Sequence, residues 1–180
     1  MVRKPEASLF EEVEKMGAGI VLKCKKCRYS LDASFGIGFL YPSTCEDLLQ
    51  QMKKGDFGKE IMDAANSIPG VAVHQRRALF VCEECGSLRV DNIIDLCVPM
   101  KQNTKRKGRF SVAFEFPDAK TYVMDDEIGS LYQVHLSVVQ KCEHCQSTMK
   151  AIADECIADE NLKCPKCKNE LAISEHYYWD

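Results

Sequence analysis

Four Cys-x-x-Cys pairs restrict what this chain can fold into more than any other feature of its sequence. A tetrahedral ion such as Zn²⁺ takes four thiolates at about 2.3 Å, and a two-residue spacer lets one tight turn present two sulfurs to the same ion. Two such turns complete one site, so four turns complete two. The sequence therefore predicts two Zn²⁺ ions with four cysteine ligands each, drawn from Cys24, Cys27, Cys82, Cys85, Cys142, Cys145, Cys164 and Cys167.

Distance along the chain indicates which pairs share an ion. Only 18 residues separate Cys145 from Cys164, so we expect the third and fourth pairs to form one site. The first and second pairs would then form the other, although 54 residues separate Cys27 from Cys82. That long gap leaves open whether the first two pairs hold the same ion.

The fold class expected is α+β, with two small antiparallel sheets around the cysteine turns. Apolar and polar residues alternate in short segments beside the pairs, as in half-buried strands. The predicted strands are 20–23, 29–35, 78–81, 88–90, 131–138 and 171–178. Helical patterns occupy residues 5–17, where Gly17-Ala18-Gly19 would end the helix, and most of residues 44–70.

These elements predict two domains in sequence order. Residues 1–100 would form the first cysteine unit, with the helices of about 44–70 inserted between its two halves. Residues 101–109 are a basic linker. Residues 110–180 would hold a β-rich segment, which includes an alternating strand at 110–116, followed by the C-terminal cysteine unit.

The turn sequences Cys24-Lys-Lys-Cys27, Cys82-Glu-Glu-Cys85-Gly86, Cys142-Glu-His-Cys145 and Cys164-Pro-Lys-Cys167 resemble those of tandem zinc-ribbon proteins with rubredoxin-type knuckles. The resemblance covers about half of the chain. It implies two zinc ribbons and four-cysteine zinc binding, with transcription, translation or nucleic-acid processing as frequent settings. The helical insertion and the β segment that starts near Arg109 depart from a simple ribbon.

The hydropathy pattern gives no sign of a membrane protein. No apolar run approaches the roughly 18 to 20 residues needed to cross a bilayer, and the N-terminal residues lack the apolar core of a secretory signal. We therefore expect a cytoplasmic protein, in which paired cysteines are metal ligands or redox groups more often than structural disulfides. The oligomeric state is left open.

One basic stretch is a candidate nucleic-acid contact. Residues 100–121 contain six basic and two acidic side chains, although the whole chain has a net charge of −3. Two four-thiolate zinc sites would take that charge to about −7, which does not favour general phosphate binding. A solvated linker would have the same composition. The candidate contacts are Lys101, Lys105, Arg106, Lys107 and Arg109, with His74, Arg76 and Arg77 as a second basic group.

The function expected is non-enzymatic. A catalytic zinc keeps one coordination position open, whereas four cysteines close the site. The leading hypothesis is a protein-interaction adaptor, the alternative is a nucleic-acid-binding protein, and a thiol redox enzyme comes third. Cys45, Cys97 and Cys156 are interpreted as packed thiols. The aromatic end at 176–179 is expected to pack on the second ribbon, or to anchor a protein partner if it is exposed.

Overall fold

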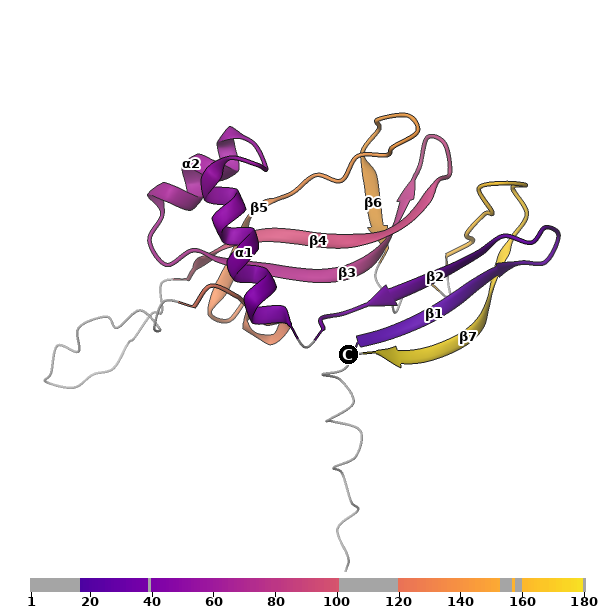
Figure 1. Cartoon of the computed structure of the whole chain (residues 1–180), viewed down its shortest axis with the longest axis horizontal. Coiled ribbons are helices and arrows are strands. Elements are labelled where there is room, and N and C mark those ends of the chain that lie inside the picture. The colour runs from indigo at the N-terminus through magenta and orange to yellow at the C-terminus, as the bar shows by residue number, and fades with distance from the viewer. Residues whose placement is uncertain (1–16, 39, 101–119, 153–156, 158–159, 180) are drawn as a thin grey trace, which may run out of the picture. The chain divides into compact units, whose positions relative to one another are not determined.

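The chain forms an α+β fold, as predicted, and the residues that the structure describes contain two α-helices and two β-sheets (Figure 1). The computed structural model describes residues 17–38, 40–100, 120–152, 157 and 160–179. Contacts divide these residues into two compact units that are discontinuous in sequence. Unit 1 takes residues 17–38, 76–92 and those from 139 onward, and unit 2 takes the residues of 40–75 and 93–138. Each unit therefore combines segments from both sides of the predicted linker.

A three-stranded antiparallel sheet in unit 1 joins the two ends of the described chain. Its strands are β1 (Gly17–Cys24), β2 (Ser30–Phe35) and β7 (Leu171–Trp179). Their order is β2-β1-β7, so the last strand of the chain pairs directly with the first (Figure 1). The aromatic end of β7 thus pairs with the first residues of β1, at the end of the strand away from the first cysteine turn, and not with a separate C-terminal ribbon.

The second sheet has four strands in the order β5-β4-β3-β6. They are β3 (Ala72–Cys82), β4 (Leu88–Pro99), β5 (Tyr132–Ser137) and β6 (Met149–Ile152). The long strands β3 and β4 contribute residues to both units. β6 pairs with the end of β3 in unit 1, and β5 pairs with the end of β4 in unit 2.

The core of unit 1 lies on one face of the three-stranded sheet. Ile20 and Leu22 alternate along β1 with residues of the opposite face, and Ala33 and Phe35 do so along β2. Leu79 of β3 belongs to the same buried cluster. Period-two alternation is what places these apolar side chains together, because successive residues of a strand face opposite sides.

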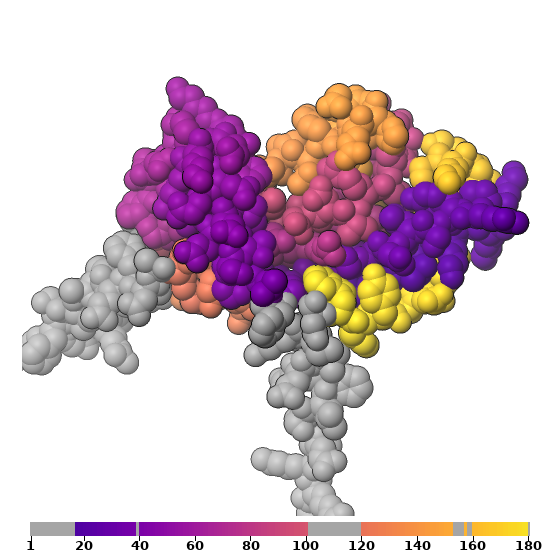
Figure 2. All heavy atoms as spheres, viewed as in Figure 1, coloured from indigo at the N-terminus to yellow at the C-terminus, as the bar shows by residue number. Residues whose placement is uncertain are grey.

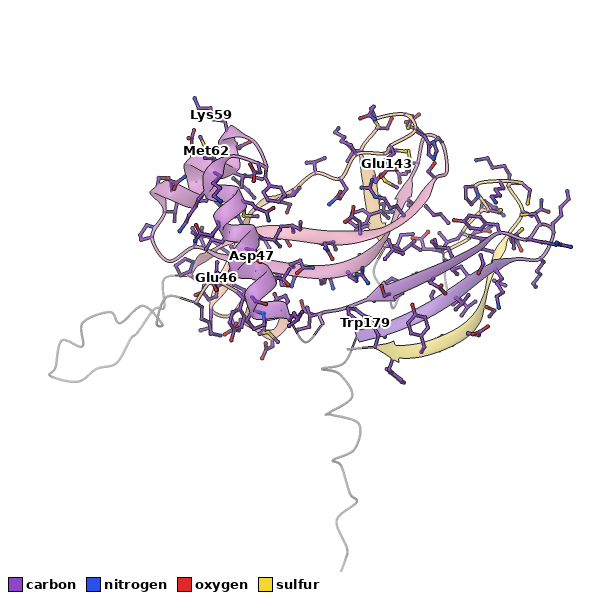
Figure 3. The ribbon with its side chains drawn as sticks, viewed as in Figure 1. Glu46, Asp47, Lys59, Met62, Glu143 and Trp179 are labelled. Atoms are coloured by element: carbon purple, nitrogen blue, oxygen red, sulfur yellow. The ribbon has the colours of Figure 1, made fainter. Side chains whose placement is uncertain are left out.

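Unit 2 contains both described helices, α1 (Tyr41–Lys54) and α2 (Lys59–Ser67). They occupy most of the range of 44–70 predicted to be helical, but α1 begins three residues before it. The buried residues of α1 are Tyr41, Cys45, Leu49 and Met52, which recur at helical spacing on one face. Glu46 and Asp47, labelled on α1 in Figure 3, are exposed. Gly55 caps the C-terminal end of α1. Its φ of 96° lies in the left-handed region, which favours glycine because a Cβ would be strained there.

A buried histidine connects three segments of unit 2. His74 of β3 is 3% exposed, and its Nδ1 lies 3.3 Å from Asp95 Oδ2 while its Nε2 lies 2.6 Å from Asp125 Oδ1. The Ser137 hydroxyl donates to the other oxygen of Asp95 at 2.6 Å. Burial lowers the pKa of His74, but the two carboxylates outweigh that effect and the net pKa is raised.

Several predictions of structure concern residues outside the described ranges. These are the helix at 5–17, the strand at 110–116 and the basic linker at 101–109. Gly17 and Gly19 do not end a helix, because they belong to β1. Among the described helices, neither has the length and apolar character required to cross a membrane.

We expect the His74→Gln variant to lower the free energy of unfolding most at acidic pH. A raised folded pKa stabilises the protein fully below the unfolded value of about 6.5, and this contribution is lost as pH rises through the folded pKa. The loss at pH 6 should be about 1–3 kcal/mol, because two carboxylates lose a partner. Denaturant unfolding from pH 6 to 8.5 measures it.

The matched control is His135→Gln on β5, where the side chain is exposed and should contribute little at any pH. An equal loss of stability at pH 6 and pH 8.5 in His74→Gln would contradict a charged histidine between the two carboxylates.

Candidate metal centres

The four Cys-x-x-Cys turns share one backbone geometry, and we call each of them a knuckle. The N–H of the first cysteine donates to the carbonyl five residues later in all four, at 2.7 to 3.0 Å. In the last three knuckles, the backbone N–H of the residue after the second cysteine donates to the backbone carbonyl of the first cysteine. That residue has a positive φ in each case and is Gly86, Gln146 or Lys168. The repeated turn confirms that the sequence motif encodes one local structure.

Two groups of four cysteines meet in unit 1, and within each group all sulfurs lie within 4.8 Å of one another. Site 1 combines the first and fourth knuckles, with Cys24 Sγ 3.4 Å from Cys167 Sγ and Cys27 Sγ 3.5 Å from Cys164 Sγ. Site 2 combines the second and third knuckles. Its sulfur distances are 3.4 Å for Cys82–Cys145 and 3.5 Å for Cys85–Cys142.

This nested pairing corrects the one expected from sequence order. Cys24 and Cys27 do not share a site with Cys82 and Cys85, and the third and fourth knuckles also belong to different sites. The physical reason is strand pairing, because β7 lies antiparallel to β1 and brings the fourth knuckle to the first. In sequence, the helices therefore lie between a knuckle of site 1 and a knuckle of site 2, and not between two knuckles paired with each other as neighbours in sequence.

The two sites are built on the same register. Cys24, at the end of β1, pairs with Leu171, which lies four residues after the last cysteine of the fourth knuckle. Cys82, at the end of β3, pairs with Met149, again four residues after the last cysteine of the third knuckle. Each site is thus a strand–knuckle–strand hairpin joined by a knuckle that leads into a third strand.

The geometry of both sites fits a tetrahedral metal ion. Four thiolates at 2.3 Å from an ion lie about 3.8 Å apart, close to the sulfur separations of 3.4 to 3.6 Å found here. The first cysteine of every knuckle is buried, and the second is partly or fully exposed. Each group therefore offers four thiol ligands at the rim of a folded unit, a donor set that could hold one metal ion.

Within site 1 the pKa values of the thiols differ widely. The backbone N–H of Cys27 donates to Cys24 and lowers the pKa of that thiol to about 6. The pKa of Cys27 rises to about 12: an N–H from Tyr29 favours its thiolate, but burial and the neighbouring sulfurs oppose another negative charge. Cys24 is therefore a thiolate at neutral pH, whereas Cys27 loses its proton readily only when a cation compensates the charge.

Site 2 shows the same contrast. The Ser87 hydroxyl, 3.1 Å from Cys85, lowers the pKa of that thiol to about 6. The pKa of Cys82 rises to about 11: an N–H from Cys85 favours the thiolate, but burial and the sulfur of Cys145 oppose it. One thiol of site 2 is therefore ready to bind a cation at neutral pH, and another must be deprotonated by it.

Positive side chains surround the knuckles. Lys168 of the fourth knuckle donates to the Cys85 carbonyl at 2.9 Å, which links site 1 directly to site 2. Lys166 lies 5.9 Å from the ring centroid of Tyr29. Arg89 pairs at 3.0 Å with Glu143, which is labelled in the third knuckle in Figure 3. These cations partly offset the charge of two four-thiolate sites.

Among the described residues, no other predicted site residue belongs to either group of four cysteines. Lys101, Lys105, Arg106, Lys107 and Arg109 lie outside the described residues, and so does Cys156. Cys45 and Cys97 are fully buried in unit 2, and burial raises their pKa values to about 11 and 12. His74, considered as a nucleic-acid contact, is buried between carboxylates and does not fit that role.

Comparisons of the chain with protein families, with curated proteins and with solved structures find no significant match. The residues and their geometry therefore carry the functional argument.

Paired cysteine replacements test the nested pairing. The double variant Cys24→Ser/Cys164→Ser removes two ligands of site 1 and should lose one metal ion per chain. Cys24→Ser/Cys82→Ser removes one ligand from each site and should weaken both ions. Native mass spectrometry with elemental analysis counts and identifies the metal. Loss of one ion by the second variant and of two by the first would contradict the pairing.

Metal affinity should depend on pH more steeply in acid. Above pH 7 Cys24 and Cys85 enter their sites as thiolates, whereas Cys27 and Cys82 must release protons. Below about pH 6 one further proton per site is displaced, so the slope of log affinity against pH should increase by about one. Competition with a chromophoric chelator from pH 5.5 to 8 measures it.

Ser87→Ala supplies the internal control, because it removes the hydroxyl that lowers the pKa of Cys85. For site 2, the increase in the slope of log affinity against pH should then begin at a higher pH. For site 1, it should begin at the same pH as in the wild type. A single slope across the range in both sites would contradict the assigned thiol pKa values.

Proposed function

We propose that this chain is a zinc protein in which two four-cysteine ribbons organise unit 1 for binding a protein partner. The observation that carries the proposal is the meeting of eight thiols in two complete sets of four. Zn²⁺ is the ion that such sets hold in structural sites, and binding it contributes folding free energy directly. The metal would then stabilise the fold, and surface residues of unit 1 would bind the partner.

Closed thiol sites favour a non-enzymatic role. Hydrolytic zinc centres usually have three protein ligands and one water, whereas four cysteines occupy every tetrahedral position. The redox alternative requires a low-pKa cysteine at the start of a helix, as in thioredoxin-like dithiols. The knuckles at residues 24–27 and 82–85 instead join two strands, and those at 142–145 and 164–167 lead into one. This arrangement supports metal binding over thiol–disulfide exchange.

Tyr178 is the best candidate for an anchor residue of the proposed adaptor surface. It is 65% exposed on β7, and β7 pairs only with β1 among the described strands. Tyrosine is enriched in the hot spots of protein interfaces, and a sheet edge can add a strand from a partner. Residues 122–180 carry eleven acidic and five basic side chains, so a partner with a basic surface is expected.

Affinity capture tests the adaptor proposal. The tagged, metal-loaded full chain should retain one protein partner reproducibly after nuclease treatment. Tyr178→Ala should reduce its recovery at least fivefold, because truncation of a hot-spot residue costs about 1 to 2 kcal/mol or more. Quantitative mass spectrometry of the captured fraction gives the ratio.

Val134→Ala is the matched control, since Val134 is an apolar side chain of unit 2 that is 43% exposed. It should leave recovery of the partner unchanged. Recovery that disappears with nuclease would instead support the nucleic-acid alternative, and equal losses in both variants would argue against Tyr178 as the anchor.

A further inference from the structure

The outer face of the three-stranded sheet carries an unusual set of side chains. In the ladder, Gly19 of β1 lies opposite Ser34 of β2 and Tyr177 of β7, so these three residues share one face. Gly17 pairs in the same way with Trp179, and Val21 pairs with Asp32. The core residues Ile20 and Leu22 occupy the opposite face, and the cluster that they form contains none of this set.

Two aromatic rings lie directly over the glycines of β1. A Cβ at Gly17 would be 2.3 Å from Trp179 Cε2, and a Cβ at Gly19 would be 2.2 Å from Tyr177 Cζ. The indole N–H of Trp179 donates to the Ala18 carbonyl at 3.0 Å, which fixes that ring against the strand. Figure 2 shows the yellow atoms of β7 lying along the indigo atoms of β1, and Figure 3 labels Trp179 at the end of this sheet.

Two groups of opposite charge stand beside the rings. Arg77 donates to the Ser34 hydroxyl at 3.0 Å, and its Cζ lies 5.4 Å from the ring centroid of Trp179. Asp32 is exposed on β2. Neither charge forms an ion pair with a residue that the structure describes. Burial raises the pKa of Tyr177, and Asp32 adds to this effect while Arg77 opposes it, so both charges act on this ring.

These residues line one cavity. Its volume is about 340 Å³, at the lower end of the range for ligand sites, and its lining is Asp32, Ser34, Arg77, Val90, Tyr177 and Trp179. Aromatic rings, a guanidinium, a hydroxyl and a carboxylate thus converge in a space suited to a flat, polar molecule.

We propose that this cavity binds a guanine base, stacked on the Tyr177 ring beside Trp179. Every nucleobase offers a flat face, and stacking on an aromatic side chain is worth about 1–3 kcal/mol per base. Guanine also matches the two charges. Its O6 and N7 accept from an arginine, while its N1–H and amino group both donate toward a carboxylate such as Asp32.

Other ligands match the cavity less well. Adenine presents an acceptor where guanine has N1–H, so Asp32 would face a lone pair. A small cation on the aromatic platform would be repelled by the Arg77 guanidinium above Trp179. A proline-rich peptide could dock on these aromatic rings, but the N–H of Trp179 donates to the Ala18 carbonyl and so offers the peptide no hydrogen bond.

The base could come from a free guanine nucleotide or from a single strand of nucleic acid, because both present the same base chemistry. This site goes beyond the proposed adaptor function and does not depend on it. The two can be tested separately, since Tyr177 and Tyr178 are adjacent on β7 and point to opposite faces of the sheet.

Isothermal titration calorimetry of the metal-loaded full chain tests the site with GMP, AMP, CMP and UMP, and with short single-stranded RNAs that contain or lack guanine. We expect saturable binding of guanine ligands at least tenfold tighter than that of adenine ligands. Binding of GMP would identify a nucleotide site, and binding of guanine-containing RNA alone would identify a single-strand site. The chain has one tryptophan, Trp179, so quenching of its fluorescence provides an independent readout.

Three variants define the outcome. Tyr177→Ala should weaken binding about tenfold or more through lost stacking. Asp32→Asn should abolish the preference for guanine over adenine. Tyr178→Ala, on the opposite face, should bind guanine as the wild type does while losing the protein partner. Unchanged metal content shows that each variant is folded.

Three results would overturn the proposal. These are no saturable binding of any guanine ligand, equal affinity for guanine and adenine in the wild type, or equal losses in Tyr177→Ala and Tyr178→Ala. Saturable binding of a proline-rich peptide at this face, in place of a base, would also overturn it and make the platform a peptide site.

Discussion

The antiparallel pairing of β1 with β7 is the interaction on which the rest of unit 1 depends. It places Cys24 beside the segment that follows Cys167, and so it decides which thiols meet in site 1. It also lays Tyr177 and Trp179 across β1, where glycines leave room for their rings. One ladder thus creates both the metal centre at one end of the sheet and the aromatic platform at the other.

Chain entropy does not oppose the nested pairing strongly. Site 1 closes a segment of 136 residues between Cys27 and Cys164, against 54 for the order expected from the sequence. Because the closure cost grows only with the logarithm of loop length, the difference is below about 1 kcal/mol. The β1–β7 ladder joins eight residue pairs, and single cross-strand pairs contribute about 0.2–1 kcal/mol. Strand pairing therefore outweighs proximity along the chain.

The sequence predicts what is local in this protein. Two cysteines separated by two residues specify a knuckle through hydrogen bonds inside one turn, so the motif identifies all eight cysteines that the structure brings together in two groups. The buried face of α1, with Cys45 and Leu49 one turn apart, follows from helical spacing. The partner of each knuckle is set by strand register between distant segments. Leu171 and Met149 each lie four residues after the last cysteine of a knuckle and pair with the first cysteine of another. This regularity predicts which knuckles share a site only when the neighbouring strands are already known.

Glycine shows the same limit at a single position. In the sequence, Gly17-Ala18-Gly19 was interpreted as the end of a helix, since glycine without context most often marks a break in regular structure. In the fold both glycines lie inside β1, where the absence of a side chain admits a ring from β7 about 160 residues away. The glycines correctly marked a special position in the backbone, but the reason for their presence depends on the side chains of the partner strand β7. Close approach of an aromatic ring to the backbone is a tertiary property, so only the structure separates a glycine that ends an element from one that forms the floor of a site.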